Sequence, residues 1–119
     1  MLMSRTKVTT NMSPKTNNIY SHIPNSKRKE VFQALLHNKN VKIERIISCG
    51  QATKKDKWLK TRHVEWVILL KGAAKLKFRK NNRLFNLKSG DYILIPANTP
   101  HRVEWTHPRT KTIWLAVHF

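Results

Sequence analysis

Apolar and polar residues alternate along much of the chain after residue 41, and this pattern constrains the fold more than any other feature. In the segment AKLKFR, residues 74–79, apolar residues alternate with Lys or Arg. Such a period of two predicts a strand with one buried face and one face in water. Similar short runs lie at 41–48, 83–87, 91–96, 101–105 and 112–119, and turn residues such as Gly, Asn and Pro separate them. About seven short strands joined by tight turns predict an all-β, antiparallel sandwich or barrel over residues 41–119.

One helix is expected before this region, over residues 26–37. Asn25 or Ser26 can cap it, and the apolar residues at positions 31, 32, 35 and 36 form a stripe at helical spacing. A helix of this length is marginal alone, so we expect it to dock on the barrel. Residues 1–16 are mostly polar and are expected to form a disordered tail. At 119 residues the chain allows a single domain, which we place at 17–119.

The composition also bears on location. No run approaches the roughly 18 consecutive apolar residues of a membrane span, so no membrane partner is expected. The first residues lack the apolar centre of a signal peptide. Cys49 is the only cysteine, which excludes an internal disulfide and fits a reducing compartment. We therefore expect a cytoplasmic protein.

The formal net charge of +18 arises from 24 Lys and Arg against six Asp and Glu. Such a charge attracts nucleic acid, anionic membranes or acidic proteins. Between residues 54 and 88, however, the basic residues are spread through predicted strands and turns rather than gathered on one helix. No nucleic-acid-binding motif accompanies them. A solvated basic surface is expected, and nucleic acid is not expected as a partner.

Two segments carry a more specific signal. In HVEWVILLKG, Glu65 is followed by six residues and then Gly72; in GDYILIPANTPH, Gly90 is followed by five residues, Pro96, four residues and His101. These segments resemble parts of the two motifs of the cupin superfamily (RmlC-like), and the chain is most similar to small single-domain bacterial cupins. The resemblance implies a small β-barrel or jelly roll, and it suggests a homodimer.

The alternation along HRVEW places His101, Val103 and Trp105 on one face of a strand. If Val103 and Trp105 point into the barrel, His101 does too. The remaining histidines, at 22, 37, 107 and 118, show no ligand spacing and are expected to be ordinary.

The family pattern breaks at the metal ligands. The resemblance would place a histidine pair at 59 and 61, or at 58 and 60, but these positions are Leu59 and Thr61, or Trp58 and Lys60. Glu65 and His101 are then the only ligands left, and two protein ligands hold a divalent ion poorly. This leaves a degenerate metal site.

His63 could restore a third ligand, because it shares strand parity with Glu65. His63, Glu65 and His101 would then form a two-histidine, one-carboxylate site suited to Fe, Mn or Zn. The family spacing instead places a turn at 61–65, with His63 facing solvent, and no cofactor would then bind. Glu65 and His101 could equally pair with each other as a structural ion pair.

The function expected first is binding of a small polar or anionic ligand in the barrel, with no assigned catalytic residue. The candidate ligand-binding residues are Glu65, His101, Lys60, Arg62 and Arg102. One alternative is a metal-dependent cupin enzyme of the dioxygenase or isomerase type, so the sequence leaves open whether the chain is an enzyme. A second alternative is a basic surface that binds nucleic acid or an acidic partner.

Overall fold

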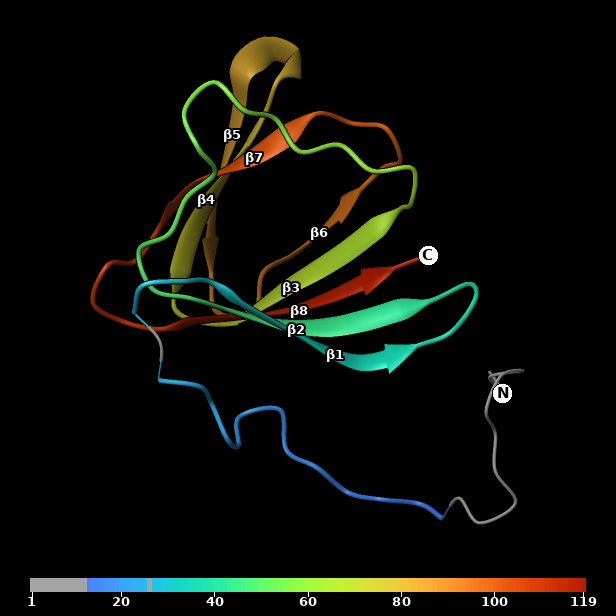
Figure 1. Cartoon of the computed structure of the whole chain (residues 1–119). Helices are drawn as coiled ribbons and strands as arrows, with labels where there is room; N and C mark the ends of the chain where they lie inside the picture. Colours follow the sequence, from blue (N-terminus) through green and yellow to red (C-terminus); the bar gives the residue numbers. More distant parts are fainter. Residues whose placement is uncertain (1–12, 26) are drawn as a thin grey trace.

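The structure, a computed structural model, describes residues 13–25 and 27–119, and in this part of the chain it contains eight strands in two antiparallel sheets (Figure 1). The elements are β1 (Val31–His37), β2 (Lys42–Ser48), β3 (Glu65–Lys71), β4 (Ala73–Phe78), the short 3-10 helix η1 (Lys80–Asn82), β5 (Arg83–Lys88), β6 (Tyr92–Ile95), β7 (His101–Thr106) and β8 (Thr112–His118).

The larger sheet has five strands in the order β1-β2-β8-β3-β6, and the smaller has three in the order β5-β4-β7. The core lies between them: Leu69 and Trp114 of the larger sheet meet Leu76 and Leu87 of the smaller one in a single cluster. The prediction of a small antiparallel barrel or jelly roll is confirmed. Among the described residues, no helix is long and apolar enough to cross a membrane.

The helix predicted over 26–37 is wrong, because Val31–His37 is the edge strand β1. Val31 pairs with Ile47 and Gln33 with Arg45, but the register shifts between Ala34 and Leu36. A bulge of this kind inserts one extra residue and breaks the alternation of a strand. The apolar residues therefore fall at a spacing that also fits a helical stripe, and the pairing with β2 decides the outcome.

Residues 1–12 of the predicted disordered tail lie outside the described residues. The segment that follows is fastened to the outer face of the larger sheet by Arg45, which is 6% exposed. Its guanidinium donates hydrogen bonds to the carbonyl oxygens of Ile19 (2.8 Å), Ser21 (2.8 Å) and His22 (3.3 Å), and to the side-chain oxygen of Gln33. The start of the described chain is thus tied to β1 and β2.

The turn between β3 and β4 requires glycine. Gly72 has a φ of +94°, and a Cβ there would lie 2.4 Å from Oγ1 of Thr112 and 2.7 Å from its Cα. Both the left-handed backbone and the contact with the start of β8 exclude a side chain. This turn therefore fixes how the chain passes from β3 in the larger sheet to β4 in the smaller one.

A second bulge changes the face of β7. Lys75 pairs with Trp105 and Leu76 with Val103, so Glu104 has no partner on β4. The prediction that Trp105 shares the inward face of His101 and Val103 is therefore wrong. Trp105 is 37% exposed, and the Lys75 ammonium lies 5.5 Å from the centre of its ring.

Candidate functional site

A cavity of about 260 Å³ lies between the two sheets, and 16 residues line it. Most of its wall is apolar and includes Ile46, Val67, Leu76, Ile95 and Trp114. A mainly apolar cavity with a few polar groups is the usual form of a small-molecule site.

The polar groups gather where β3 and β7 begin and β8 ends. Nε2 of His118 lies 2.9 Å from Oε1 of Glu44, and Nδ1 of His118 lies 3.8 Å from Oε2 of Glu65. Nε2 of His101 lies 3.8 Å from Oε1 of Glu65. Glu44, His118, Glu65 and His101 thus form a row of alternating carboxylates and imidazoles, which we call the acid–imidazole row.

Strand alternation brings this row together. Glu44 lies on the face of β2 that also carries Ile46, and His118 lies on the face of β8 that carries Trp114 and Ala116. In the larger sheet, Glu65 pairs with His118 across β3 and β8. All four side chains of the row are therefore directed to the cavity.

For the neutral form of each imidazole, the hydrogen bonds assign the position of the proton. Nδ1 of His101 lies 2.8 Å from the carbonyl oxygen of Thr99, which can only accept, so Nδ1 carries the hydrogen. Nε2 of His118 donates to Glu44 in the same way. The two nitrogens that face Glu65, Nε2 of His101 and Nδ1 of His118, therefore carry lone pairs.

Two of the five predicted ligand-binding residues belong to the row, namely Glu65 and His101, and Lys60 also lines the cavity. Arg62 is exposed and is not among the lining residues. Arg102 is directed elsewhere: its guanidinium lies 2.9 Å from Glu104 and donates to the carbonyl oxygen of Thr53. The structure thus gathers three of the five.

Glu44 and His118 were missed by sequence reasoning, and His118 is not the ordinary residue that its spacing indicated. Both residues share strand parity with apolar neighbours that point inward, which is the signal that could have found them. Their contact joins residues 74 positions apart, and only the adjacency of β2 and β8 reveals it.

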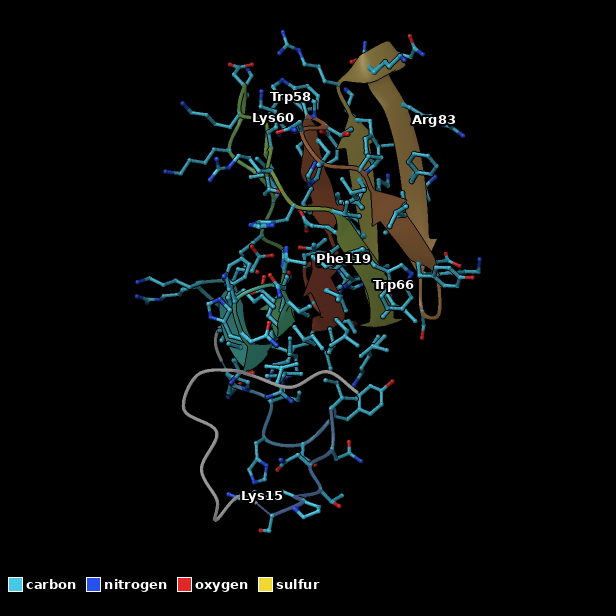
Figure 2. All side chains as sticks on the ribbon, turned by 90° about the vertical axis from the view of Figure 1, so that its right-hand side faces the viewer. Lys15, Trp58, Lys60, Trp66, Arg83 and Phe119 are labelled. Carbon is cyan, nitrogen blue, oxygen red and sulfur yellow. The ribbon has the colours of Figure 1, made fainter. Side chains whose placement is uncertain are left out.

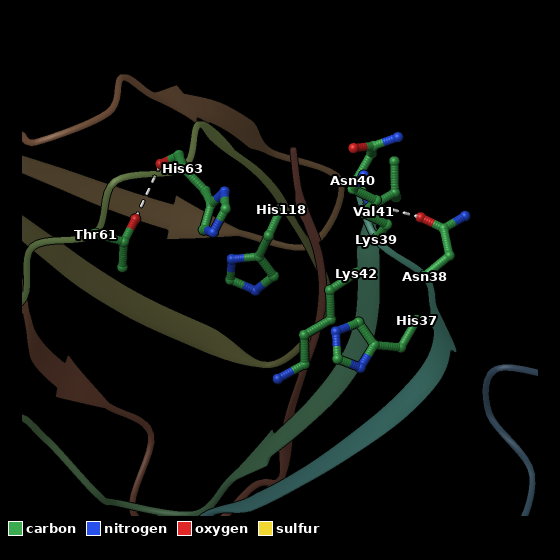
Figure 3. Close-up of a pocket in the computed structure, with 9 residues that line it drawn as sticks. All are labelled: His37, Asn38, Lys39, Asn40, Val41, Lys42, Thr61, His63 and His118. Atoms are coloured by element: carbon green, nitrogen blue, oxygen red, sulfur yellow. Dashed lines mark hydrogen bonds between the residues drawn. The ribbon is translucent and has the colours of Figure 1, made fainter. Parts of the chain in front are cut away.

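His63 lies outside this cavity. It is exposed and lines a neighbouring pocket, together with His37 and His118, at the end of β8 (Figure 3). His118 lines both spaces, so it is the member of the acid–imidazole row that borders the pocket of His63.

The electrostatic character of the cavity is opposite to that of the whole chain. Three of the six acidic residues line it, namely Glu30, Glu44 and Glu65. Glu30 accepts a hydrogen bond from the hydroxyl of Ser48, and the Lys42 ammonium lies 3.4 Å from Oε2 of Glu44. Among the described residues, Glu65 has charged contacts only with the two histidines.

The row does not fit a resident metal ion. No group of three or more His, Cys, Asp and Glu side chains could hold one among residues 13–25 and 27–119. The two oxygens of Glu65 face two different imidazoles, so these groups lie in a row instead of surrounding one point.

Comparison with known proteins places the fold in a family. The family model described as "Cupin domain" matches residues 50–118. A protein from Ralstonia eutropha JMP134, provisionally named a mannose-6-phosphate isomerase, is 39% identical, with a TM-score of 0.84. The alignment covers 88% of this chain and 97% of that one. The chain belongs to the cupin superfamily.

More distant cupins share the fold alone. A cupin superfamily protein from Desulfitobacterium hafniense DCB-2 is 16% identical with a TM-score of 0.73, over 92% of this chain and 94% of that one. An RmlC-like cupin from Desulfovibrio desulfuricans is 14% identical with a TM-score of 0.65, over 89% and 97%. The search of curated proteins found no match.

In this cupin, the loop that would carry the family's histidine pair reaches the cavity with other side chains. Leu59, Lys60 and Thr61 line it. The backbone of Leu59 forms two hydrogen bonds with that of His101, of 2.6 and 3.0 Å. The loop is therefore fixed beside the row, but Leu59 and Thr61 supply no imidazole.

Proposed function

We propose that this cupin binds a small polar organic molecule in the cavity between its sheets, held by the acid–imidazole row. The observation that carries the proposal is this row of two carboxylates and two imidazoles at one end of a mainly apolar cavity. Such a site buries the apolar part of a ligand and orients it through a few polar contacts. The name of the Ralstonia relative supports a ligand of the size of a sugar.

The charge of the ligand follows from the lining. An anionic ligand was expected from three basic residues, of which only Lys60 lines the cavity, whereas three carboxylates line it. An anionic group of the ligand could therefore pair only with Lys60. Figure 2 labels Lys60 beside Trp58, at one end of the molecule. We propose an uncharged polar group for the part of the ligand that contacts Glu65.

A pair of variants tests whether the row is a binding site or a structural pair. We expect the double variant E65A/H101A to fold and to lose the thermal stabilisation that a bound small molecule gives to the wild type. E104A is the matched control, because Glu104 is exposed and pairs with Arg102 outside the cavity. A large loss of melting temperature in E65A/H101A without any ligand-dependent shift in the wild type would favour the structural pair.

A metal-dependent enzyme is the alternative, although the row as it stands gathers no three ligands around one point. The far nitrogen of each histidine is held by an acceptor, an arrangement also found around histidines that ligate metals. Glu65 and His101 would be ligands, with His63 or His118 as the third and Fe, Mn or Zn as the ion. Elemental analysis of protein purified without a metal-affinity tag tests this; metal well below one ion per chain, with none taken up on addition, would exclude it.

We also propose a cytoplasmic location. Cys49 is a free, half-buried thiol and is the chain's only cysteine, which suits a reducing compartment.

A further inference from the structure

We infer that the site recognises its ligand through hydrogen-bond donors and that the ligand is an uncharged polyhydroxyl compound with neighbouring hydroxyl groups. This inference rests on the proposed function, since it names the chemical class that the same cavity takes. It follows from the directions of the hydrogen bonds in and around the acid–imidazole row.

Glu65 offers two acceptor oxygens that no protein donor satisfies. Its contacts to Nε2 of His101 and Nδ1 of His118 are both 3.8 Å, which is beyond hydrogen-bond range. In the described part of the chain, no other group donates to its carboxylate. Its side chain is 14% exposed and lines the cavity, so a bound ligand can reach its oxygens.

The neighbours of Glu65 are acceptors too. In its neutral form each imidazole has one N–H, which His101 donates to Thr99 and His118 to Glu44, so the other nitrogen turns a lone pair toward the carboxylate. Four acceptor atoms, two oxygens and two nitrogens, therefore face one another with no hydrogen between them. Acceptor atoms that face one another gain from any donor placed between them, so this arrangement favours a molecule that brings donors into the cavity.

The donors elsewhere in the wall are already used. The indole of Trp114 donates to Ser48, whose hydroxyl donates to Glu30. The hydroxyl of Thr61 donates to the carbonyl oxygen of His63. Lys60 is the remaining donor of the wall, and it is exposed.

Two kinds of ligand bring several donors at once, namely polyols and cations such as ammonium groups. The three carboxylates of the cavity would attract a cation, but the wall is mainly apolar, and burying a charge there costs more free energy than burying a hydroxyl group. Neighbouring hydroxyls on a carbon skeleton supply separate hydrogens to Glu65 and to each histidine, and the skeleton packs on the apolar wall. The uncharged polyhydroxyl compound is therefore favoured.

The decisive variant is E65Q, which keeps the shape of the side chain but replaces an acceptor oxygen with an NH₂ donor. The new donor can satisfy a lone pair of His101 or His118. We therefore expect E65Q to melt higher than the wild type, by about 3 °C or more. We also expect it to lose at least tenfold in affinity for polyols, because an acceptor that the ligand needs is gone.

The experiment measures melting temperature and calorimetric binding at about pH 8, where free imidazole is neutral. The protein is first treated with a chelator. The probes are D-mannose and ribitol, their O-methylated forms, ethanolamine, inorganic phosphate and Zn²⁺. E104Q is the control, with wild-type stability and binding expected. The wild type should bind the free polyols and not the methylated forms, which keep the size but lack the donors.

The other outcomes separate the inference from the proposed function. Binding of phosphate but not polyols would overturn the inference and leave a binding site; so would stronger binding of ethanolamine. A larger stabilisation by Zn²⁺ would overturn it in favour of a metal centre. If E65Q has a lower melting temperature than the wild type, the inference fails whichever probe binds. If no probe binds and E65Q melts lower, both the inference and the proposed function fail.

Discussion

At position 118 a histidine lies between two carboxylates, at 2.9 Å from Glu44 and 3.8 Å from Glu65. Both carboxylates are largely shielded from solvent, with side chains 8% and 14% exposed. The imidazole therefore donates to one acid and separates it from the other. Lys42 contributes a second contact to Glu44 at 3.4 Å.

Removing this imidazole should destabilise the protein. In H118A, Glu44 loses its histidine donor while remaining buried, and we expect a loss of about 2–3 kcal/mol in the free energy of unfolding. Urea denaturation measures it. H63A is the control, because His63 is exposed in the neighbouring pocket and should change stability by less than about 0.5 kcal/mol. Equal losses in the two variants would contradict this role for His118.

Gly72 and Gly90 allow a matched comparison of backbone strain and steric contact. Both have a φ of +94°, but a Cβ at Gly72 would lie 2.4 Å from Thr112, whereas one at Gly90 would meet nothing within 4 Å. We expect G90A to cost about 1 kcal/mol from backbone strain alone. G72A should cost about 3 kcal/mol or more, because overlap with β8 is added. Thermal or urea unfolding of the two variants compares them directly, and similar losses would show that the contact relaxes.

At the scale of the elements, Arg45 joins three segments. Its guanidinium reaches three carbonyl oxygens of the segment before β1 and the side chain of Gln33 on β1. A buried guanidinium with this many acceptors holds the segment in one position on the sheet.

The variant R45M should release this segment. Three carbonyl oxygens lose their donor, so we expect about 2–4 kcal/mol less stability and faster cleavage after Tyr20 by chymotrypsin. R79M is the control, since Arg79 is an exposed residue at the turn after β4. Unchanged cleavage in R45M would mean that other contacts hold the segment.

Most strands could be predicted from the sequence because alternation and turn residues are local signals. The failures occur at the two bulges. One extra residue in β1 turned an edge strand into an apparent helical stripe, and one in β7 moved Trp105 to the outer face. A bulge depends on the partner strand, which a local pattern does not contain.

The candidate site was predictable only in part for a related reason. Glu65 and His101 lie in recognisable motifs, so their approach could be expected. Glu44 and His118 join the row because β2, β8 and β3 are neighbours in the larger sheet. That order follows from long-range pairing and is invisible to residue spacing.

At the scale of the whole molecule, most of the described Lys and Arg residues are exposed, whereas three of the six acidic residues line the cavity. We expect RNA to bind only weakly and at low salt, because such contacts act through the phosphates and are screened. Fluorescence anisotropy with a labelled single strand at about 50 mM and about 150 mM salt measures this. Binding that persisted at the higher salt and fell in W105A would favour the basic-surface alternative, because exposed Trp105 beside Lys75 could stack on a base.

We propose a homodimer, as the family resemblance suggests, through the outer face of the larger sheet. Tyr92 and Leu94 on edge strand β6 are 66% and 54% exposed, and Tyr92 lies 5.4 Å from Trp66, ring to ring. Light scattering after size-exclusion chromatography should give twice the mass of 14.0 kDa. L94E should give a monomer, whereas L84E, on the smaller sheet, should not. A monomeric wild type would exclude the dimer.

The loop at 59–61 has a consequence for how cupins diverge. Its backbone is already bonded to His101, and the side chains at both ends of it line the cavity. Acquiring or losing the histidine pair at 59 and 61 would therefore alter two side chains and no strand. Within such a scaffold, the chemistry of the cavity can change by point mutation while the strands of the barrel stay the same.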